Sequence, residues 1–216
     1  MTRTEDLIEA LARDSGPVRR LRGPWTRTGG WLACAGLTIG AVVAVDGVCP
    51  NLAARLADPL FAAGLAAAGV TGALAGTSAF LLGLPDRSRL WALLPAPSAL
   101  VWLGALGFDC LGRWTPAPEG AIQTGDATHC LCVFLAVSGM IAAALLWMLR
   151  PMPLAHGRGV TLLAGLAVAG LGVTGFTLTR TFDTSALMLT GNLGMGALAT
   201  LVLIQGWGRA MAARAG

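Results

Sequence analysis

Six long apolar runs with no charge near their middle constrain the fold of this chain more than any other feature. They cover roughly residues 29–48, 60–84, 90–108, 128–150, 159–179 and 185–207, and short breaks that contain charges or prolines separate them. A helix needs about 20 apolar residues to cross the hydrocarbon core of a bilayer. The mean hydropathy of +0.70 and the charged fraction of only 12% also indicate lipid rather than water as the solvent. We therefore expect an all-α integral membrane bundle of six transmembrane helices.

The arginines predict the orientation of these spans. All 15 basic residues are arginines, and 12 of them lie in residues 1–28, 85–89 and 150–158 and in the tail. The positive-inside rule places these segments in the cytoplasm, and arginines scattered over several loops form no nucleic-acid patch. The first 28 residues are too polar, and the next run is too long, for a cleavable signal peptide. We expect a multi-pass inner-membrane protein with both termini cytoplasmic: a cytoplasmic segment 1–28, a transmembrane domain 29–208 and a tail 209–216.

Small residues and tryptophans are expected to organise the bundle. The second span has small residues at a strict four-residue spacing: Gly64, Ala68, Gly72 and Gly76. Gly36 and Gly40 repeat the pattern in the first span. Such faces let helices approach closely, either within one bundle or between two copies in a homodimer. Tryptophans at or near the span ends are expected to anchor the chain at the membrane interfaces: Trp25, Trp31, Trp91, Trp114, Trp147 and Trp207.

Several functional classes lack their usual residues. No acidic or basic residue lies near the middle of a predicted span, where ion-coupled transporters place ionisable groups, and Asn192 and Gln205 are the main polar exceptions. No HExxH, Walker or GxSxG pattern is present, so we expect no enzyme and no catalytic residue. A small inner-membrane transporter or channel-like protein is the alternative from another class. A membrane enzyme with metal chemistry at His129, Cys130 and Cys132 comes third.

The amino-terminal segment is the only sizeable piece expected in the cytoplasm. Thr4 can cap a short helix on which Leu7, Ile8 and Leu11 form one apolar stripe. A helix of about ten residues is marginal alone and gains from burying such a stripe. We therefore expect a short amphipathic helix that packs into a groove of a partner protein or onto the membrane surface.

Several short sequence elements stand in a characteristic order along the chain. Residues 4–14 read TEDLIEALARD, residues 17–21 read PVRRL, and residues 24–25 read PW, ahead of the six spans. Residues 52–59 read LAARLADP in the first outer loop, and residues 91–95 read WALLP where the third span opens. In these elements and their order the chain resembles the NrsF family of bacterial membrane anti-sigma factors, over nearly its whole length.

The resemblance implies a negative regulator of an extracytoplasmic-function (ECF) sigma factor of the sigma F type. It implies that the cytoplasmic segment holds the sigma factor at the membrane, away from core RNA polymerase, and releases it in a stress response. The side chains expected to bury against that factor are Leu7, Ile8, Leu11, Val18 and Leu21. Full burial of one such aliphatic side chain is worth roughly 1.5 to 3 kcal/mol. The expected partners are thus a sigma factor and membrane lipid, without direct contact to nucleic acid.

The cysteines allow more than one interpretation. Cys49, Cys110 and Cys130 map to the outer ends of spans, in a compartment that permits disulfides, whereas Cys34 lies in the cytoplasmic half of the first span. An antiparallel hairpin of the third and fourth spans would bring Cys110 and Cys130 close together. A bridge between them would close a loop of about 20 residues and contribute on the order of 3 kcal/mol. Alternatively, the cysteines pack as small apolar residues.

His129, Cys130 and Cys132 together suggest a second use of the same region. Imidazole and thiolates are soft ligands that suit transient binding of zinc, cadmium or copper(I), and we expect no other cofactor. In a helix, positions 130 and 132 point to nearly opposite faces. One metal ion could therefore hold both thiols only where the chain is irregular.

The resemblance also implies redox or heavy-metal sensing by outer-face cysteines. Cys130 matches the family's cysteine near the start of the fourth span, but the usual second cysteine has no counterpart, because residues 180–184 read RTFDT. Either Cys110 or Cys49 takes the partner role, or this chain senses another signal. We expect a bond or metal at Cys130 to shift the hairpin of the third and fourth spans and thereby change how the amino-terminal helix is presented.

Overall fold

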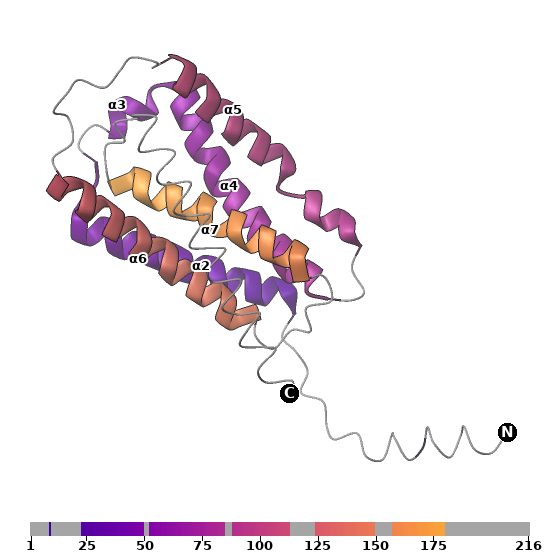
Figure 1. Ribbon diagram of the computed structural model, residues 1–216. Coiled ribbons are helices and arrows are strands. Elements are labelled where there is room, and N and C mark those ends of the chain that lie inside the picture. Colours follow the sequence, from indigo (N-terminus) through magenta and orange to yellow (C-terminus); the bar gives the residue numbers. More distant parts are fainter. Residues whose placement is uncertain are drawn as a thin grey trace.

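The computed structural model describes residue 9 and residues 23–49, 52–84, 88–112, 124–149 and 157–179. These parts contain helices and no strand (Figure 1). The α-helices are α2 (Pro24–Asp46), α3 (Leu52–Leu56), α4 (Pro59–Leu82), α5 (Ala96–Gly112), α6 (Thr124–Leu149) and α7 (Gly157–Thr179), and η1 (Arg89–Leu93) is a 3-10 helix. The predicted all-α class is therefore confirmed for the described residues.

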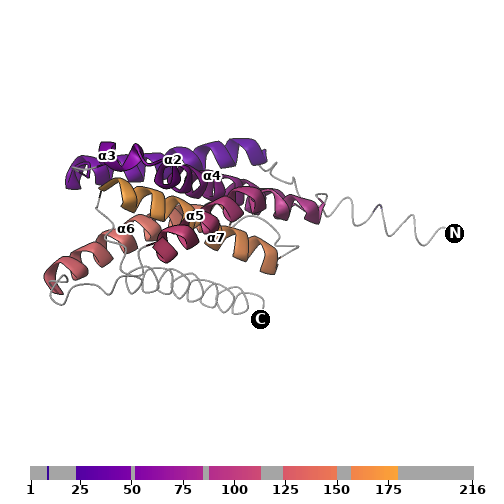
Figure 2. The same ribbon diagram turned by 90° about the horizontal axis from the view of Figure 1, so that it is seen from above.

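The long helices lie side by side in one bundle (Figures 1 and 2). α4 makes its most extensive contact with α7, and α5 packs on α4. α6 packs on α7 and on α2, so α5 and α6 lie on opposite sides of α7 in Figure 1. We call the end of the bundle where α2 begins and α6 ends the Arg27 end, and the opposite end the Cys49 end.

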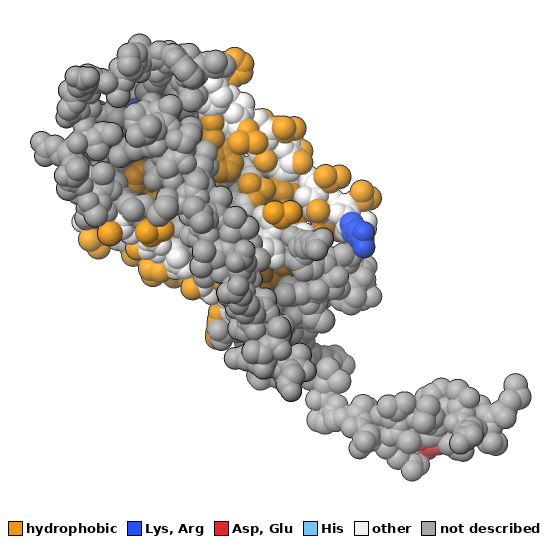
Figure 3. Space-filling view, in the orientation of Figure 1, with side chains coloured by type: hydrophobic (Ala, Val, Ile, Leu, Met, Phe, Trp, Pro, Cys, Tyr) orange, Lys and Arg blue, Asp and Glu red, His pale blue; other side chains and the backbone are white. Residues whose placement is uncertain are grey.

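Five helical segments of the described chain are long and apolar enough to cross a membrane. They are Pro24–Asp46, Pro59–Leu82, Arg89–Phe108, Cys132–Leu149 and Gly159–Thr179. Large apolar side chains also cover much of the exposed surface, as Figure 3 shows, and they include Leu37, Val45, Leu100 and Leu162. A surface of this kind is matched to lipid, so the chain is a membrane protein. The sixth predicted span, 185–207, lies outside the described residues.

Local sequence explains where these helices begin. α2 starts at Pro24 rather than at residue 29, because proline has no N–H to leave unpaired and its φ angle suits the first helical position. Asp58 caps α4 by accepting a 2.9 Å hydrogen bond from the Leu60 N–H, and Pro59 occupies the first turn. At the other end of α2, Gly47 adopts a φ of 82°, which favours glycine and ends the helix.

The third predicted span is not one continuous α-helix. The Leu94 N–H bonds the Trp91 carbonyl, which closes η1, and the Ala99 N–H bonds the Pro95 carbonyl at the start of α5. Pro95 and Pro97 have no N–H, so the α-helical hydrogen-bond pattern cannot run through this point. The mean hydropathy of residues 90–108 stays high across this break. The sequence interpretation therefore missed it.

Close backbone approaches hold α4 in the middle of the bundle. A Cβ added to Gly170 would lie 2.6 Å from the Ala68 carbonyl oxygen, and one added to Gly72 would lie 2.8 Å from the Leu171 nitrogen. Gly64 meets Ala105 of α5. The small-residue face predicted on the second span is therefore used inside the bundle, where it lets α7 and α5 approach.

The expectation that Trp31 is an interfacial anchor was wrong. Its side chain is 0% exposed and belongs to the core cluster shared by α2, α4, α6 and α7. The glycine at position 76 leaves a notch that the indole ring fills, because a Cβ there would overlap the ring. Trp25 and Trp147, in contrast, are exposed near the Arg27 end, as an anchor requires.

Candidate functional site

The amino-terminal segment connects directly to α2. Of residues 1–22 the structure describes only Glu9, which is helical and exposed. The predicted partner-binding side chains lie outside the described residues: Leu7, Ile8, Leu11, Val18 and Leu21. The segment leads through Gly23 into the first turn of α2, so any displacement of that turn also displaces the segment's point of attachment.

The first turns of α2 are tied to the second half of α6. The Arg27 guanidinium donates a 3.2 Å hydrogen bond from Nη1 to the Met148 carbonyl oxygen. One turn further along, the Trp31 indole N–H donates to the Ile141 carbonyl oxygen at 3.2 Å. Sequence reasoning missed both residues. A signal was present in the helical spacing of the buried residues Thr28, Trp31, Ala35 and Thr38, but a helix that is apolar on all sides hides such a pattern.

Cys49 lies at the other end of the bundle, against α7. Its side chain is 3% exposed and its thiol is free, and its backbone N–H donates a 3.1 Å hydrogen bond to the Leu178 carbonyl oxygen. This bond holds the turn after α2 onto the last turn of α7. Cys49 is thereby placed beside Leu178, two residues before the start of the sequence RTFDT at 180–184, where the sequence comparison finds no counterpart of the second cysteine.

Cys130 and Cys132 both lie in the helical backbone of α6. Cys132 is exposed with a free thiol, whereas the side chains of His129 and Cys130 lie outside the described residues. A metal ion shared by the two thiols required an irregular chain, and the backbone of Thr124–Leu149 is regular helix instead. Among the described residues, no group of three or more metal-ligating side chains gathers.

The hairpin that was expected to join Cys110 and Cys130 is not packed as predicted. Cys110 lies in the last turns of α5, and α5 contacts α4, whereas α6 contacts α7 and α2. Helices that follow one another in sequence were assumed to be neighbours in space. Here α7 lies between them (Figure 1). The side chain of Cys110 lies outside the described residues.

Two of the sequence elements that carry the resemblance lie at helix boundaries. Residues 52–59 form α3 and the Asp58 cap of α4, and the Arg55 guanidinium lies 4.5 Å above the centroid of the Phe61 ring. Residues 91–95 form η1 and its junction with α5. These elements therefore shape the bundle rather than supply chemistry.

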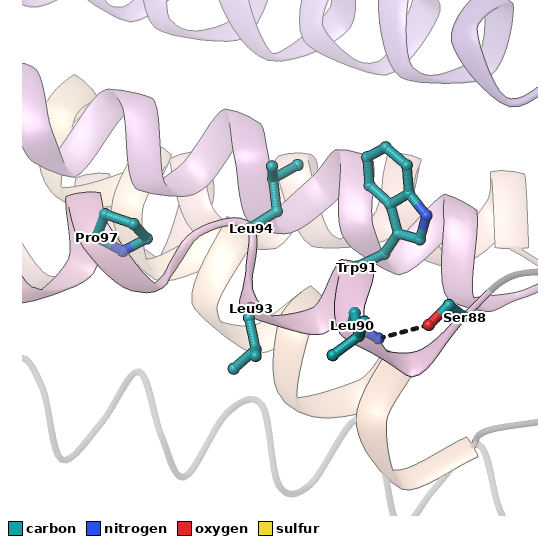
Figure 4. A pocket seen from close by; sticks show the side chains of 6 residues that line it. All are labelled: Ser88, Leu90, Trp91, Leu93, Leu94 and Pro97. Atoms are coloured by element: carbon teal, nitrogen blue, oxygen red, sulfur yellow. Dashed lines mark hydrogen bonds between the residues drawn. The ribbon is translucent and has the colours of Figure 1, made fainter.

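A shallow apolar groove of about 500 Å³ lies at the junction of η1 and α5 (Figure 4). Its lining residues are Ser88, Leu90, Trp91, Leu93, Leu94 and Pro97. Trp91 and Leu94 point to one side of the segment and Leu90 and Leu93 to the other, where they are exposed. Its one hydroxyl, Ser88 Oγ, accepts the Leu90 N–H. The groove thus offers no acid, base or nucleophile aligned for catalysis.

Comparison with known proteins identifies a family. A family model described as NrsF, negative regulator of sigma F, matches residues 11–212. No curated protein and no solved structure matches the chain. The matched range begins inside the amino-terminal segment and continues through the whole described bundle.

Proposed function

The chain belongs to the NrsF family of negative regulators of sigma F, and we propose that it is a multi-pass membrane anti-sigma factor that sequesters an ECF sigma factor. The observation that carries this proposal is the extent of the family match, from residue 11 to residue 212. It includes residues 11–28 of the amino-terminal segment together with the bundle, so both parts contribute to the family match. The family description assigns regulation of a sigma factor, not catalysis.

The topology we propose has six spans with both termini in the cytoplasm of a bacterium. Five apolar helices of the described chain support five crossings, and residues 185–207 supply the sixth. The arginine distribution assigns the Arg27 end to the cytoplasm and the Cys49 end to the outer side. Segment 1–28 then meets the sigma factor, although its last residues already belong to α2, and 209–216 forms a cytoplasmic tail.

We propose that the apolar stripe of the segment binds the sigma factor. Leu7, Ile8 and Leu11 form its centre, and Val18 and Leu21 extend it. Since each buried aliphatic side chain contributes roughly 1.5 to 3 kcal/mol, the stripe can offset the cost of ordering the segment. The charged residues around it keep the free segment soluble.

The test measures retention of the sigma factor by membranes that contain the full chain. A Leu7→Ala, Leu11→Ala double variant should weaken binding on the order of 100-fold, because two central apolar contacts are lost. The matched control is Leu100→Ala, Leu103→Ala, which removes two leucines exposed on α5 and should leave binding unchanged. Equal retention by the wild type and the amino-terminal variant would contradict the proposal.

For the signal, we propose that Cys49 is the partner of Cys130, in a redox or soft-metal response that triggers a stress programme. Two contacts support Cys49 over Cys110. The Cys49 N–H bonds the Leu178 carbonyl, and Phe176 of the same turn of α7 packs edge-on against Phe134, with ring centroids 5.9 Å apart. Phe134 follows Cys130 by one turn of α6. The two cysteines therefore approach the same end of α7 from α2 and α6.

Serine variants separate the sensor cysteines. Cys130→Ser and Cys49→Ser should each abolish release of the sigma factor by diamide or Cd²⁺, whereas Cys110→Ser and Cys34→Ser should leave release intact. Mass spectrometry after diamide treatment should find a Cys49–Cys130 disulfide. A full response by the Cys49→Ser variant would exclude the pairing while leaving sigma-factor binding by the amino-terminal segment untouched.

A further inference from the structure

Two hydrogen bonds join α2, which follows the amino-terminal segment, to α6, which carries Cys130. We propose that α2 senses the position of α6 through Trp31 and Arg27, which act as positioning residues for the sigma-factor-binding segment. The proposal rests on the proposed function, because it names the path by which the segment is regulated. It replaces the movement of a hairpin of the third and fourth spans by a direct contact between α2 and α6.

The Trp31 contact is buried and specific. Its indole N–H lies 3.2 Å from the Ile141 carbonyl oxygen in the core of the bundle. A helical carbonyl already accepts an N–H from the next turn, and the indole uses its second lone pair. No water competes for this donor, so a displaced α6 leaves the N–H unsatisfied unless α2 follows.

The close packing around the indole keeps the Trp31 side chain from following α6 without its backbone. Gly76 of α4 faces the ring so closely that a Cβ would overlap it, and Phe80 packs edge-on at a centroid distance of 6.4 Å. With α4 on one side and α6 on the other, the fully buried ring has little room to move. The position of α6 is therefore transmitted to the backbone of α2.

The Arg27 contact extends this coupling to the first turn of α2. Met148 precedes the last residue of α6, so its carbonyl belongs to the group that has no donor within the helix. A guanidinium there also complements the negative end of the helix dipole. Arg27 lies four residues before Trp31, on the same face of α2, and six residues after Leu21, the last of the proposed sigma-factor-binding side chains.

α4 also meets this half of α2, where Gly76 and Phe80 pack against Trp31, whereas the described parts of α5 and α7 contact other regions. α5 packs on α4, on the far side of α7 from α6. α7 meets α2 through Ile39 against Gly175 and through the Cys49 backbone, both toward the Cys49 end. Arg27 and Trp31 supply the two hydrogen bonds described above that tie α6 to the half of α2 that carries the segment.

The test displaces α6 without any external signal. A Cβ on Gly172 of α7 would lie 2.5 Å from Ser138 Oγ of α6, so Gly172→Val pushes the two helices apart. The matched control, Gly139→Val, adds the same side chain to α6 where nothing lies within 4 Å. Each change is made in the full chain, alone and together with Trp31→Phe, which keeps an aromatic ring and removes the donor. The readout is the fraction of sigma factor that sediments with the membranes.

We expect Gly172→Val to change the retained fraction about fivefold, the factor that one hydrogen bond contributes, and Gly139→Val to leave it unchanged. Trp31→Phe alone should retain the sigma factor, but it should abolish the effect of Gly172→Val. Trp102→Phe, which alters a buried tryptophan of α5, should not abolish it. Arg27→Gln should reduce the effect in part, and Arg89→Gln, at an exposed arginine of η1, should not.

Two outcomes overturn the coupling: no effect of Gly172→Val on retention, or an effect that persists undiminished with Trp31→Phe. Should Gly172→Val fail to accumulate in membranes, Gly172→Ala makes the same displacement smaller, and the same comparison decides. Failure of the proposed function has a different signature, since the wild type itself would then retain no more sigma factor than the Leu7→Ala, Leu11→Ala variant.

Discussion

The helix pairs α4–α7 and α2–α6 are held together in different ways. α4 and α7 touch backbone to backbone at Gly72 and Gly170, with no room for a methyl group. α2 and α6 meet through the long side chains of Trp31 and Arg27, while the glycines Gly36, Gly40 and Gly139 on these two helices have nothing within 4 Å of an added Cβ. The first pair cannot shift without a clash, whereas the second can shift as long as its hydrogen-bond donors follow.

The same small-residue pattern therefore has two meanings in one chain. On α4 it marks the contact at the centre of the bundle, and 67% of its apolar window is buried. On α2 only 22% of the window is buried, and the glycines face outward. Spacing alone does not distinguish a face that a neighbour has filled from one that is open.

The largest effect should come from filling the α4–α7 contact. Gly170→Leu places a side chain against the Ala68 carbonyl and the Gly72 backbone, so we expect a loss of about 3 kcal/mol in the free energy of unfolding. Unfolding in mixed micelles with increasing SDS measures this loss. The control is Gly36→Leu on the open face of α2, and an equal loss in both variants would remove the distinction between the pairs.

A smaller loss is expected where α4 receives Trp31. Gly76→Ala forces the indole out of its notch and should cost about 2 kcal/mol in the same unfolding assay. The atoms nearest to the added methyl group belong to the six-membered ring of the indole. The ring of phenylalanine does not extend as far from the backbone. The double variant Gly76→Ala, Trp31→Phe should therefore recover part of the loss. Simple additivity of the two changes would argue that the notch does not constrain the ring.

The α2–α6 pair should be less sensitive to loss of a single donor. Arg27→Gln removes the charged donor to the Met148 carbonyl at the end of α6, and we expect a loss of about 1 kcal/mol. Arg89→Gln, at an exposed position, provides the reference in the same assay. Stability equal to that of the reference would show that the Arg27 bond contributes nothing measurable.

The smallest effect should have the opposite sign. Gly40→Ala on the open face of α2 meets no atom within 4 Å and reduces the freedom of the unfolded chain, so we expect a gain of about 0.5 kcal/mol. Gly72→Ala is the counterpart on α4 and should destabilise instead, because its methyl group would meet the Leu171 backbone. A loss at Gly40 would indicate that another helix occupies this face in the membrane.

Length and hydropathy predicted the spans well, because the bilayer sets the length of an apolar helix directly. The first five predicted runs each coincide with a described apolar helical segment. The break at Pro95 was missed although the prolines were visible, since an average over 20 residues dilutes two of them. The sixth run and the amino-terminal stripe remain predictions.

Lateral packing could not be predicted in the same way. Lipid solvates the sides of apolar helices as well as another helix does, so hydropathy does not select neighbours. α5 and α6 were taken as a hairpin because they are consecutive, yet the glycines of α4 and α7 bring these two together instead. Trp31 was predicted to be an interfacial residue because it lies close to the start of the first predicted run. Its burial depends on Gly76, which lies 45 positions later in the chain.

The contact between Gly72 and Gly170 also bears on how the protein is made. α4 and α7 are separated by the whole of α5 and α6, and helices enter the membrane in the order of their synthesis. The surface of α4 around Gly72 therefore faces lipid until the ribosome has completed α7. The central contact of the bundle therefore forms late in synthesis. A chain that stops before residue 157 lacks α7 and cannot form it.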